Sequence, residues 1–296
     1  MNGKNKYSGK NFRTTQCGKN NKKYLKEESI IPEMKATLLL LTANLFLTIA
    51  GIFLFRESRI NRLKYTELPY ILIFGILFLA VSALFIVEVK IDPIISSRFG
   101  LDFTRRIYEL EGDIVAAFQT IRNPFLDYYF AFVYMIGFPF LLYFTPVLYI
   151  VSKDVKSLKF AVVAYAIAIA ISLPFLLLFP VHDTWWSSQN YAWYDGRPIY
   201  FRLGEIWPSV VGIFFKFTTL NNCFPSLHSC LSAIMAYTAW IRGYNRYKYV
   251  AILFAISIPI ATLYLGIHWL TDIVAGEAIA LIAIIISMKM SGVKWK

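Results

Sequence analysis

Seven runs of apolar residues, separated by short polar segments, dominate the chain from residue 36 onward. A helix that crosses the hydrocarbon core of a bilayer needs about 20 consecutive apolar residues, and these runs are close to that length. Because backbone polar groups in lipid must be satisfied within the spanning segment, such runs predict helices. The pattern therefore predicts an all-α fold, a polytopic bundle of membrane helices. The predicted spans are residues 36–55, 69–89, 125–151, 160–180, 225 or 226–241, 249–268 and 270–288.

Composition supports this interpretation and divides the chain into two parts. Of the 296 residues, 57% are hydrophobic and only 16% are charged, whereas soluble domains average about 25% charged. Residues 1–35 are polar and rich in Lys and Asn, which predicts a basic, disordered tail before a membrane domain at 36–296. The net charge of +12 comes from short basic clusters between apolar runs, which favours a membrane with anionic lipids over nucleic acid as a partner.

The basic clusters also predict the orientation of the bundle. They occupy residues 56–64, 152–159, 242–248 and 289–296, and alternating spans place all four on one side, which is therefore expected to be cytoplasmic. We expect a multi-pass protein of the cell membrane. Seven spans put the basic tail on the other side, against the same tendency. That other side also receives two longer segments within residues 90–123 and 181–224, which predict short helices at the membrane interface.

The chain has only three histidines, and the predicted topology places all of them on the non-cytoplasmic side. His182 follows the fourth span, His228 begins the fifth and His268 ends the sixth. Three imidazoles at one membrane edge, near Ser and Asp, predict an active site there.

The segment PSLH, residues 225–228, has the features of a helix start. Proline is common in the first turn, and Ser226 is a favoured N-cap residue. A helix N-terminus presents free N–H groups and the positive end of the helix dipole, which suits a phosphate. His228 then lies in the first turn, beside the bound anion.

A second pair, His268 and Asp272, is four residues apart. The two share a face if one helix runs through them. Alternatively, the chain bends here, because the sixth and seventh spans meet at this point. In either case the carboxylate can accept a hydrogen bond from Nδ1 and leave Nε2 as a base or nucleophile.

These motifs resemble those of the type 2 phosphatidic acid phosphatase superfamily, which carries P-S-x-H and, on a later helix, H-x-x-x-D. The contexts NCFPSLHS and HWLTDIVAG look most like the branch containing inositol phosphorylceramide synthase and related lipid phosphotransferases. The resemblance covers about residues 69–290, and it implies a six-span phosphatase-like core plus one extra N-terminal span.

The resemblance also implies roles for four residues and no metal or other cofactor. His268 would be the nucleophile that forms a phosphohistidine, and Asp272 would orient it. His228 would protonate the leaving oxygen, and Ser226 would bind phosphate oxygens. The substrate would be a lipid phosphate, diphosphate or phosphodiester, and the acceptor would be water or an alcohol such as inositol.

Two positions depart from the family pattern. Thr262 stands where the later motif usually has Arg, and Asn190 stands where the first motif usually has Lys. Other side chains are therefore expected to bind phosphate or assist the site. The candidates are Arg197, Arg202, Lys216 and His182 for phosphate, and Glu277 as an accessory or gating group within the seventh span.

Two other functions stay open at this level. Three histidines and an aspartate on one side are a ligand set for zinc, which would make the protein a metal-dependent membrane hydrolase. A non-catalytic lipid-binding or transport protein of the same fold is the other alternative. The three cysteines contain no CxxC pair and predict no disulfide framework. Cys223 and Cys230, which flank the first motif, are expected to be small packing residues.

Overall fold

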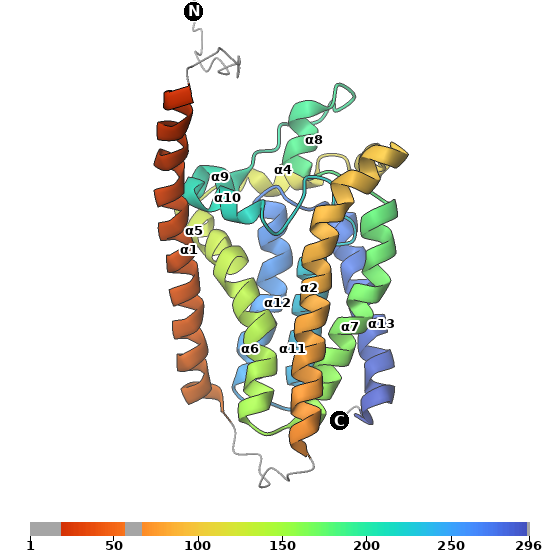
Figure 1. The fold of residues 1–296 in the computed structure, drawn as a ribbon. Coiled ribbons are helices and arrows are strands. Elements are labelled where there is room, and N and C mark those ends of the chain that lie inside the picture. The colour runs from red at the N-terminus through yellow and green to blue at the C-terminus, as the bar shows by residue number, and fades with distance from the viewer. Residues whose placement is uncertain (1–18, 57–66, 295–296) are drawn as a thin grey trace, which may run out of the picture.

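The structure, a computed structural model, describes residues 19–56 and 67–294, and Figure 1 shows its fold. The described part is helical and contains no β-strand, which confirms the predicted all-α bundle. The long helices are α1 (Lys19–Phe55), α2 (Leu68–Phe99), α5 (Pro124–Phe132), α6 (Phe138–Val151), α7 (Val155–Leu178), α11 (Leu227–Ile241), α12 (Tyr247–Tyr264) and α13 (Leu270–Ser291). A π-helical turn, Val133–Gly137, joins α5 and α6 into one continuous segment.

Six of the described helical segments are long and apolar enough to cross a membrane. Their bounds are Pro32–Phe55, Leu68–Ser96, Pro124–Val151, Val155–Leu178, Tyr247–Tyr264 and Leu270–Ser291. The fifth predicted span corresponds to α11, whose 15 residues make a helix only about 22 Å long. α11 therefore agrees with the bounds predicted for the fifth span, but it is shorter than the other six segments.

The position of α11 explains why a short helix is tolerated there. It packs against α12, α13, α7 and α6, and most of its side chains are buried. Irregular backbone at membrane depth is stable where protein covers it. By contrast, α1 and α2 leave most of their apolar side chains exposed, as expected for helices that face lipid.

The first helix begins earlier than the sequence predicts. α1 starts at Lys19, so residues 19–35, which the sequence assigns to the tail, are helical in the structure. Lys, Glu and Leu in this stretch are good helix formers, and they continue the helix beyond its apolar part. Residues 1–18 of the predicted tail lie outside the described residues.

The short elements gather at one end of the bundle, above the N-termini of α11 and α13 (Figure 1). They are α3 (Thr104–Glu111), α4 (Ile114–Gln119), α8 (Thr184–Asn190), α9 (Arg202–Ile206), a 3-10 turn (Pro208–Val210) and α10 (Val211–Phe214). They agree with the short helices predicted for residues 90–123 and 181–224.

The helix ends next to the predicted basic clusters lie at the opposite end of the bundle, together with the C-terminus (Figure 1). Arg242 there contacts Asp154 at 3.2 Å, so the α11–α12 connection is tied to the α6–α7 connection. The bundle thus has one end with basic connections and one end covered by short helices, and the two motifs lie at the covered end.

Candidate active site

The first motif forms the N-terminus of α11, as its residue types predict. Ser226 is the N-cap, and its Oγ accepts a long hydrogen bond, 3.4 Å, from the backbone N–H of Ser229. Ser226 is fully buried, and its own backbone N–H donates to the carbonyl oxygen of Asp272 at 2.9 Å. His228 follows in the first turn and is half-buried. The start of α11 is thereby joined directly to the first turn of α13.

Between α12 and α13 the chain bends, so the second of the two sequence alternatives holds. α12 ends at Tyr264, α13 begins at Leu270, and His268 lies in the connection. Gly266 adopts φ +77°, and a Cβ there would come within 2.5 Å of the Tyr200 carbonyl oxygen, so glycine is required. Asp272 closes the bend, because its Oδ2 accepts the Trp269 N–H at 2.8 Å.

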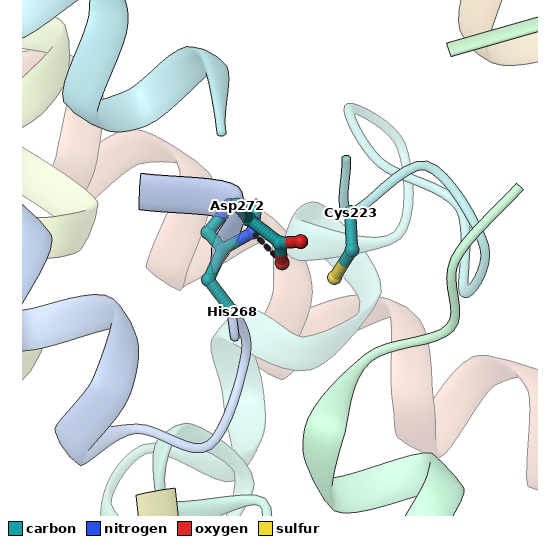
Figure 2. Close-up of side chains that lie close together, drawn as sticks. All are labelled: Cys223, His268 and Asp272. Atoms are coloured by element: carbon teal, nitrogen blue, oxygen red, sulfur yellow. Dashed lines mark hydrogen bonds and ion pairs between the residues drawn. The ribbon is translucent and has the colours of Figure 1, made fainter. Parts of the chain in front are cut away.

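The bend and the start of α11 bring three side chains into a line. Asp272 Oδ2 lies 3.3 Å from His268 Nδ1, and His268 Nε2 lies 3.2 Å from His228 Nδ1. His268 and Asp272 are buried, and Figure 2 shows the contact between them. The predicted clustering of Ser226, His228, His268 and Asp272 at one end of the bundle is confirmed, while their catalytic roles remain predictions.

Burial sets the protonation state of His268. It lowers the pKa of this imidazole to about 3, so the ring is neutral at physiological pH. A carboxylate on the Nδ1 side favours the tautomer with the proton on Nδ1. Nε2 then keeps its lone pair and faces His228, which is the arrangement required of a nitrogen nucleophile.

Two aromatic rings that the sequence did not single out hold His228. The ring centroids of Tyr134 and Phe138 lie 4.8 and 4.7 Å from that of the imidazole. Tyr134 lies in the π-helical turn and Phe138 begins α6 immediately after it. Such turns are frequent at functional sites. In the sequence, Gly137 and Pro139 are a weak signal of the irregular turn. No sequence signal indicates that its aromatic residues contact His228.

A second layer of polar groups lies behind His268. The Cys223 thiol donates to Asp183 Oδ1 at 3.0 Å and lies 3.1 Å from the Ile267 carbonyl oxygen. Burial raises the pKa of the Cys223 thiol well above its usual value and that of the Asp183 carboxyl to about 8. Cys223 therefore does more than the packing that the sequence predicts, because it links the connection containing His268 to residue 183.

Glu111 is a further residue that sequence reasoning missed. This last residue of α3 accepts hydrogen bonds from the backbone N–H groups of Leu270, at 2.8 Å, and Thr271. Burial raises the pKa of its carboxyl group, although both hydrogen bonds act in the other direction. A carboxylate at a helix N-terminus caps free N–H groups and interacts favourably with the helix dipole. Glu111 therefore fixes the start of α13, two residues after His268.

The basic residues proposed to bind phosphate are engaged elsewhere. Among the described residues, Arg197, Arg202 and Lys216 make no hydrogen bond or ion pair with the two histidines. Each contacts a carboxylate instead: Arg197 contacts Asp113 at 3.1 Å, Arg202 contacts Glu205 at 2.8 Å, and Lys216 contacts Glu33 at 3.4 Å. The local acidic partners compensate these cations, and the sequence pattern does not reveal such pairing.

The third histidine and Glu277 also lie apart from the histidine pair. His182 Nδ1 is 3.0 Å from the Tyr191 hydroxyl and 3.8 Å from Asp102 Oδ1, and its ring stacks on Trp186. The group of potential metal ligands that the described residues bring together contains His268 but neither His182 nor His228, so the three-histidine set is not assembled there. Glu277 lines an apolar groove of about 510 Å³ between α11, α12 and α13.

The comparison with known protein families adds independent support. Residues 178–296 match the sequence model of the PAP2 superfamily, whose members are generally phosphatases. The matched segment contains both motifs and all four clustered residues. Comparisons with curated proteins and with solved structures found no match.

Proposed function

We propose that this protein is an integral membrane lipid phosphatase or phosphotransferase that works through a phosphohistidine on His268. The observation that carries the proposal is the line from Asp272 through His268 to His228 at the N-termini of two helices. The family match over residues 178–296 supports the same reaction class. The apolar helices around the site support a substrate whose hydrophobic tail stays in the bilayer.

The first half-reaction transfers the phosphoryl group to the protein. The lone pair of His268 Nε2 forms a bond to phosphorus while the bond from phosphorus to the lipid oxygen breaks. His228, in its protonated imidazolium form, gives one proton to that leaving oxygen and becomes neutral, because an alkoxide is a poor leaving group. Asp272 stabilises the positive charge that develops on the His268 ring.

The backbone contributes to binding the transferred group. The start of α11 directs N–H groups and the positive end of its dipole toward the space beside His228, and such a terminus favours an anion. The hydroxyl group of Ser226 is a further hydrogen-bond donor in this proposal. Because this side chain is buried, the phosphate must first come into contact with it. Preorganised donors of this kind stabilise charge on the phosphoryl oxygens as the transition state forms.

The second half-reaction restores the protein. Water or an acceptor alcohol attacks phosphorus, passes its proton to His228, and the bond between phosphorus and Nε2 breaks. Water makes the protein a phosphatase, and an alcohol such as inositol makes it a transferase of the kind that the sequence resembles. The site, in this proposal, faces the non-cytoplasmic side of the cell membrane, because the basic connections lie at the opposite end.

A panel assay tests the proposal. Purified protein in detergent is incubated with lipid phosphates, lipid diphosphates and phospholipids, with and without inositol, and both released phosphate and new phospholipid are measured. We expect turnover of at least one lipid by the native protein and none by His268→Ala. Turnover that is equal in the two proteins would refute the proposal, and its absence on every lipid would favour a non-catalytic role.

A further inference from the structure

Three different metal-ligand types meet behind the proposed nucleophile. The Cys223 sulfur, one ring nitrogen of His268 and one carboxylate oxygen of Asp272 all lie within 4.8 Å of one another, and all three residues are buried (Figure 2). A set of one thiolate, one imidazole and one carboxylate matches the ligands that Zn²⁺ takes in proteins. Hard cations such as Mg²⁺ prefer sites made of oxygen alone.

A second observation points to a ligand at this place. Asp272 Oδ2 contacts His268 and Trp269, but Asp272 Oδ1 is buried without a hydrogen-bond partner among the described residues. Buried polar atoms in native proteins are nearly always paired, so an orphaned carboxylate oxygen requires an explanation. Figure 2 shows the Asp272 carboxylate between the His268 ring and the Cys223 sulfur.

The charge around these three ligands also fits a divalent cation. Asp183 Oδ1 lies 3.0 Å from the Cys223 sulfur, which provides a second carboxylate at the same place. No Lys or Arg side chain in the described part of the chain forms an ion pair with Asp183 or Asp272. Two buried carboxyl groups and a thiol without a basic partner are costly to ionise, and a bound cation removes that cost.

We propose that Cys223, His268 and Asp272 form a Zn²⁺ site whose occupation inhibits the protein. Ligand atoms around a tetrahedral zinc lie ~3.5 Å apart, given bonds of about 2.0–2.3 Å. Because all three ligand atoms already lie within 4.8 Å of one another, only small side-chain movements are needed on binding. Cys223 loses its thiol proton to solvent, as metal binding to cysteine requires.

Inhibition follows from the tautomer of His268, and this consequence rests on the proposed function. Nδ1 is the ring nitrogen on the Asp272 side, at 3.3 Å, so Nδ1 is the atom that coordinates zinc. Its proton then moves to Nε2, and the ring stays neutral. A protonated Nε2 has no lone pair for phosphorus, so the metal-bound protein cannot form the phosphohistidine.

Metal binding is tested without any activity measurement. A variant that retains Cys223 as its only cysteine, Cys17→Ser with Cys230→Ser, is titrated with Co²⁺, a spectroscopic substitute for Zn²⁺. We expect a thiolate-to-cobalt charge-transfer absorption that Zn²⁺ abolishes and Mg²⁺ does not. The matched variant with Cys223→Ser in the same background is expected to lack it. An absent band in the first variant, or an unchanged band in the second, would overturn the site.

X-ray absorption of the zinc-loaded native protein avoids dependence on variants that fail to fold. One sulfur neighbour at about 2.3 Å with nitrogen and oxygen neighbours at about 2.0–2.1 Å supports the site. A shell of oxygen and nitrogen alone overturns it.

Activity then separates this inference from the proposed function. Zn²⁺ is expected to suppress phosphate release by the native protein, and Cys223→Ser is expected to raise the inhibitory concentration roughly tenfold or more. Cobalt binding to a protein that turns over no lipid would leave the metal site in place and contradict the proposed function. Activity that requires zinc and is lost with a chelator would overturn inhibition and favour a metal-dependent hydrolase.

Discussion

His228 Nδ1 lies 3.2 Å from His268 Nε2, although 40 residues of chain separate the two imidazoles. One begins α11, and the other lies in the bend before α13. The hydrogen bond from the Ser226 N–H to the Asp272 carbonyl oxygen, 2.9 Å long, holds these two places together. The distance between the histidines therefore depends on how closely the first turns of α11 and α13 approach.

Gly276 makes that close approach possible, so enlarging it should separate the two helices. A Cβ at this position would lie 2.3 Å from the Ser226 carbonyl oxygen and 2.7 Å from the Ser229 hydroxyl. We expect Gly276→Ala to destabilise the protein by about 1–3 kcal/mol and to lower phosphate release strongly. Gly75→Ala is the control, because a Cβ on α2 at residue 75 meets nothing within 4 Å. Equal activity of the two variants would contradict this account of the packing.

Asp272→Asn tests the orienting role of the carboxylate. An amide has a similar shape, but it no longer stabilises the proton on Nδ1 or the positive ring of the intermediate. We expect the melting temperature to change little and kcat to fall roughly 10³–10⁴-fold, as in other oriented histidine systems. Asp127→Asn is the matched control, since Asp127 is also a buried carboxylate but contacts the Tyr264 hydroxyl instead. A rate for Asp272→Asn within a few-fold of the native rate would exclude this role.

Glu111 is expected to act by position rather than by contact with the substrate. Glu111→Ala removes the acceptor for two N–H groups at the start of α13, so the bend that holds His268 loosens. We expect kcat to fall about 10-fold with a smaller change in KM, and Glu111→Gln, which retains an acceptor oxygen, to recover part of the loss. Glu109→Gln, in the same helix but exposed and paired with Arg105, should have the native rate. Failure of Gln to perform better than Ala would argue against the hydrogen bonds as the cause.

Asp183 should make stability depend on pH in a defined direction. Burial raises its pKa from 3.8 to about 8, so between these pH values the folded protein keeps a proton that the unfolded chain releases. Its contribution to stability is therefore lost as the pH rises from about 4 to about 8. We expect Asp183→Asn to flatten the decrease of the melting temperature across this range. Parallel curves for the two proteins would show that Asp183 is already ionised in the folded state.

The apolar pattern was sufficient to predict most of the bundle but not the length of every helix. Runs near 20 residues located the spans because lipid leaves the backbone no alternative to helix. The start of α11 at Leu227 was predictable from Pro225 and Ser226, whereas the surrounding helices that cover this short span were not. Likewise, the charged residues after Lys19 continue α1 by their helix propensity, which an apolar pattern does not detect.

At the site, residue types at helix ends predicted the histidine pair. The contacts that distant segments make with the site were not predicted. His228, His268 and Asp272 were predictable because topology alone places both motifs at one end. Glu111 and Tyr134 act from α3 and the π-helical turn, and no local signal connects them to residues 228 or 270. The phosphate-binding role proposed for the arginines gained no support, because these side chains form ion pairs with nearby carboxylates. Such pairs form only in the folded chain and could not be predicted from the sequence.

Trapping the covalent intermediate tests the central claim most directly. The protein is incubated with lipid phosphate labelled in the phosphoryl group, quenched in alkali, and analysed for label on the chain and its position. We predict label that is stable to base and labile to acid, present on His268 in the native protein and absent from His268→Ala. Label that persists in His268→Ala and disappears in His228→Ala would show that His228 is the nucleophile and contradict the account.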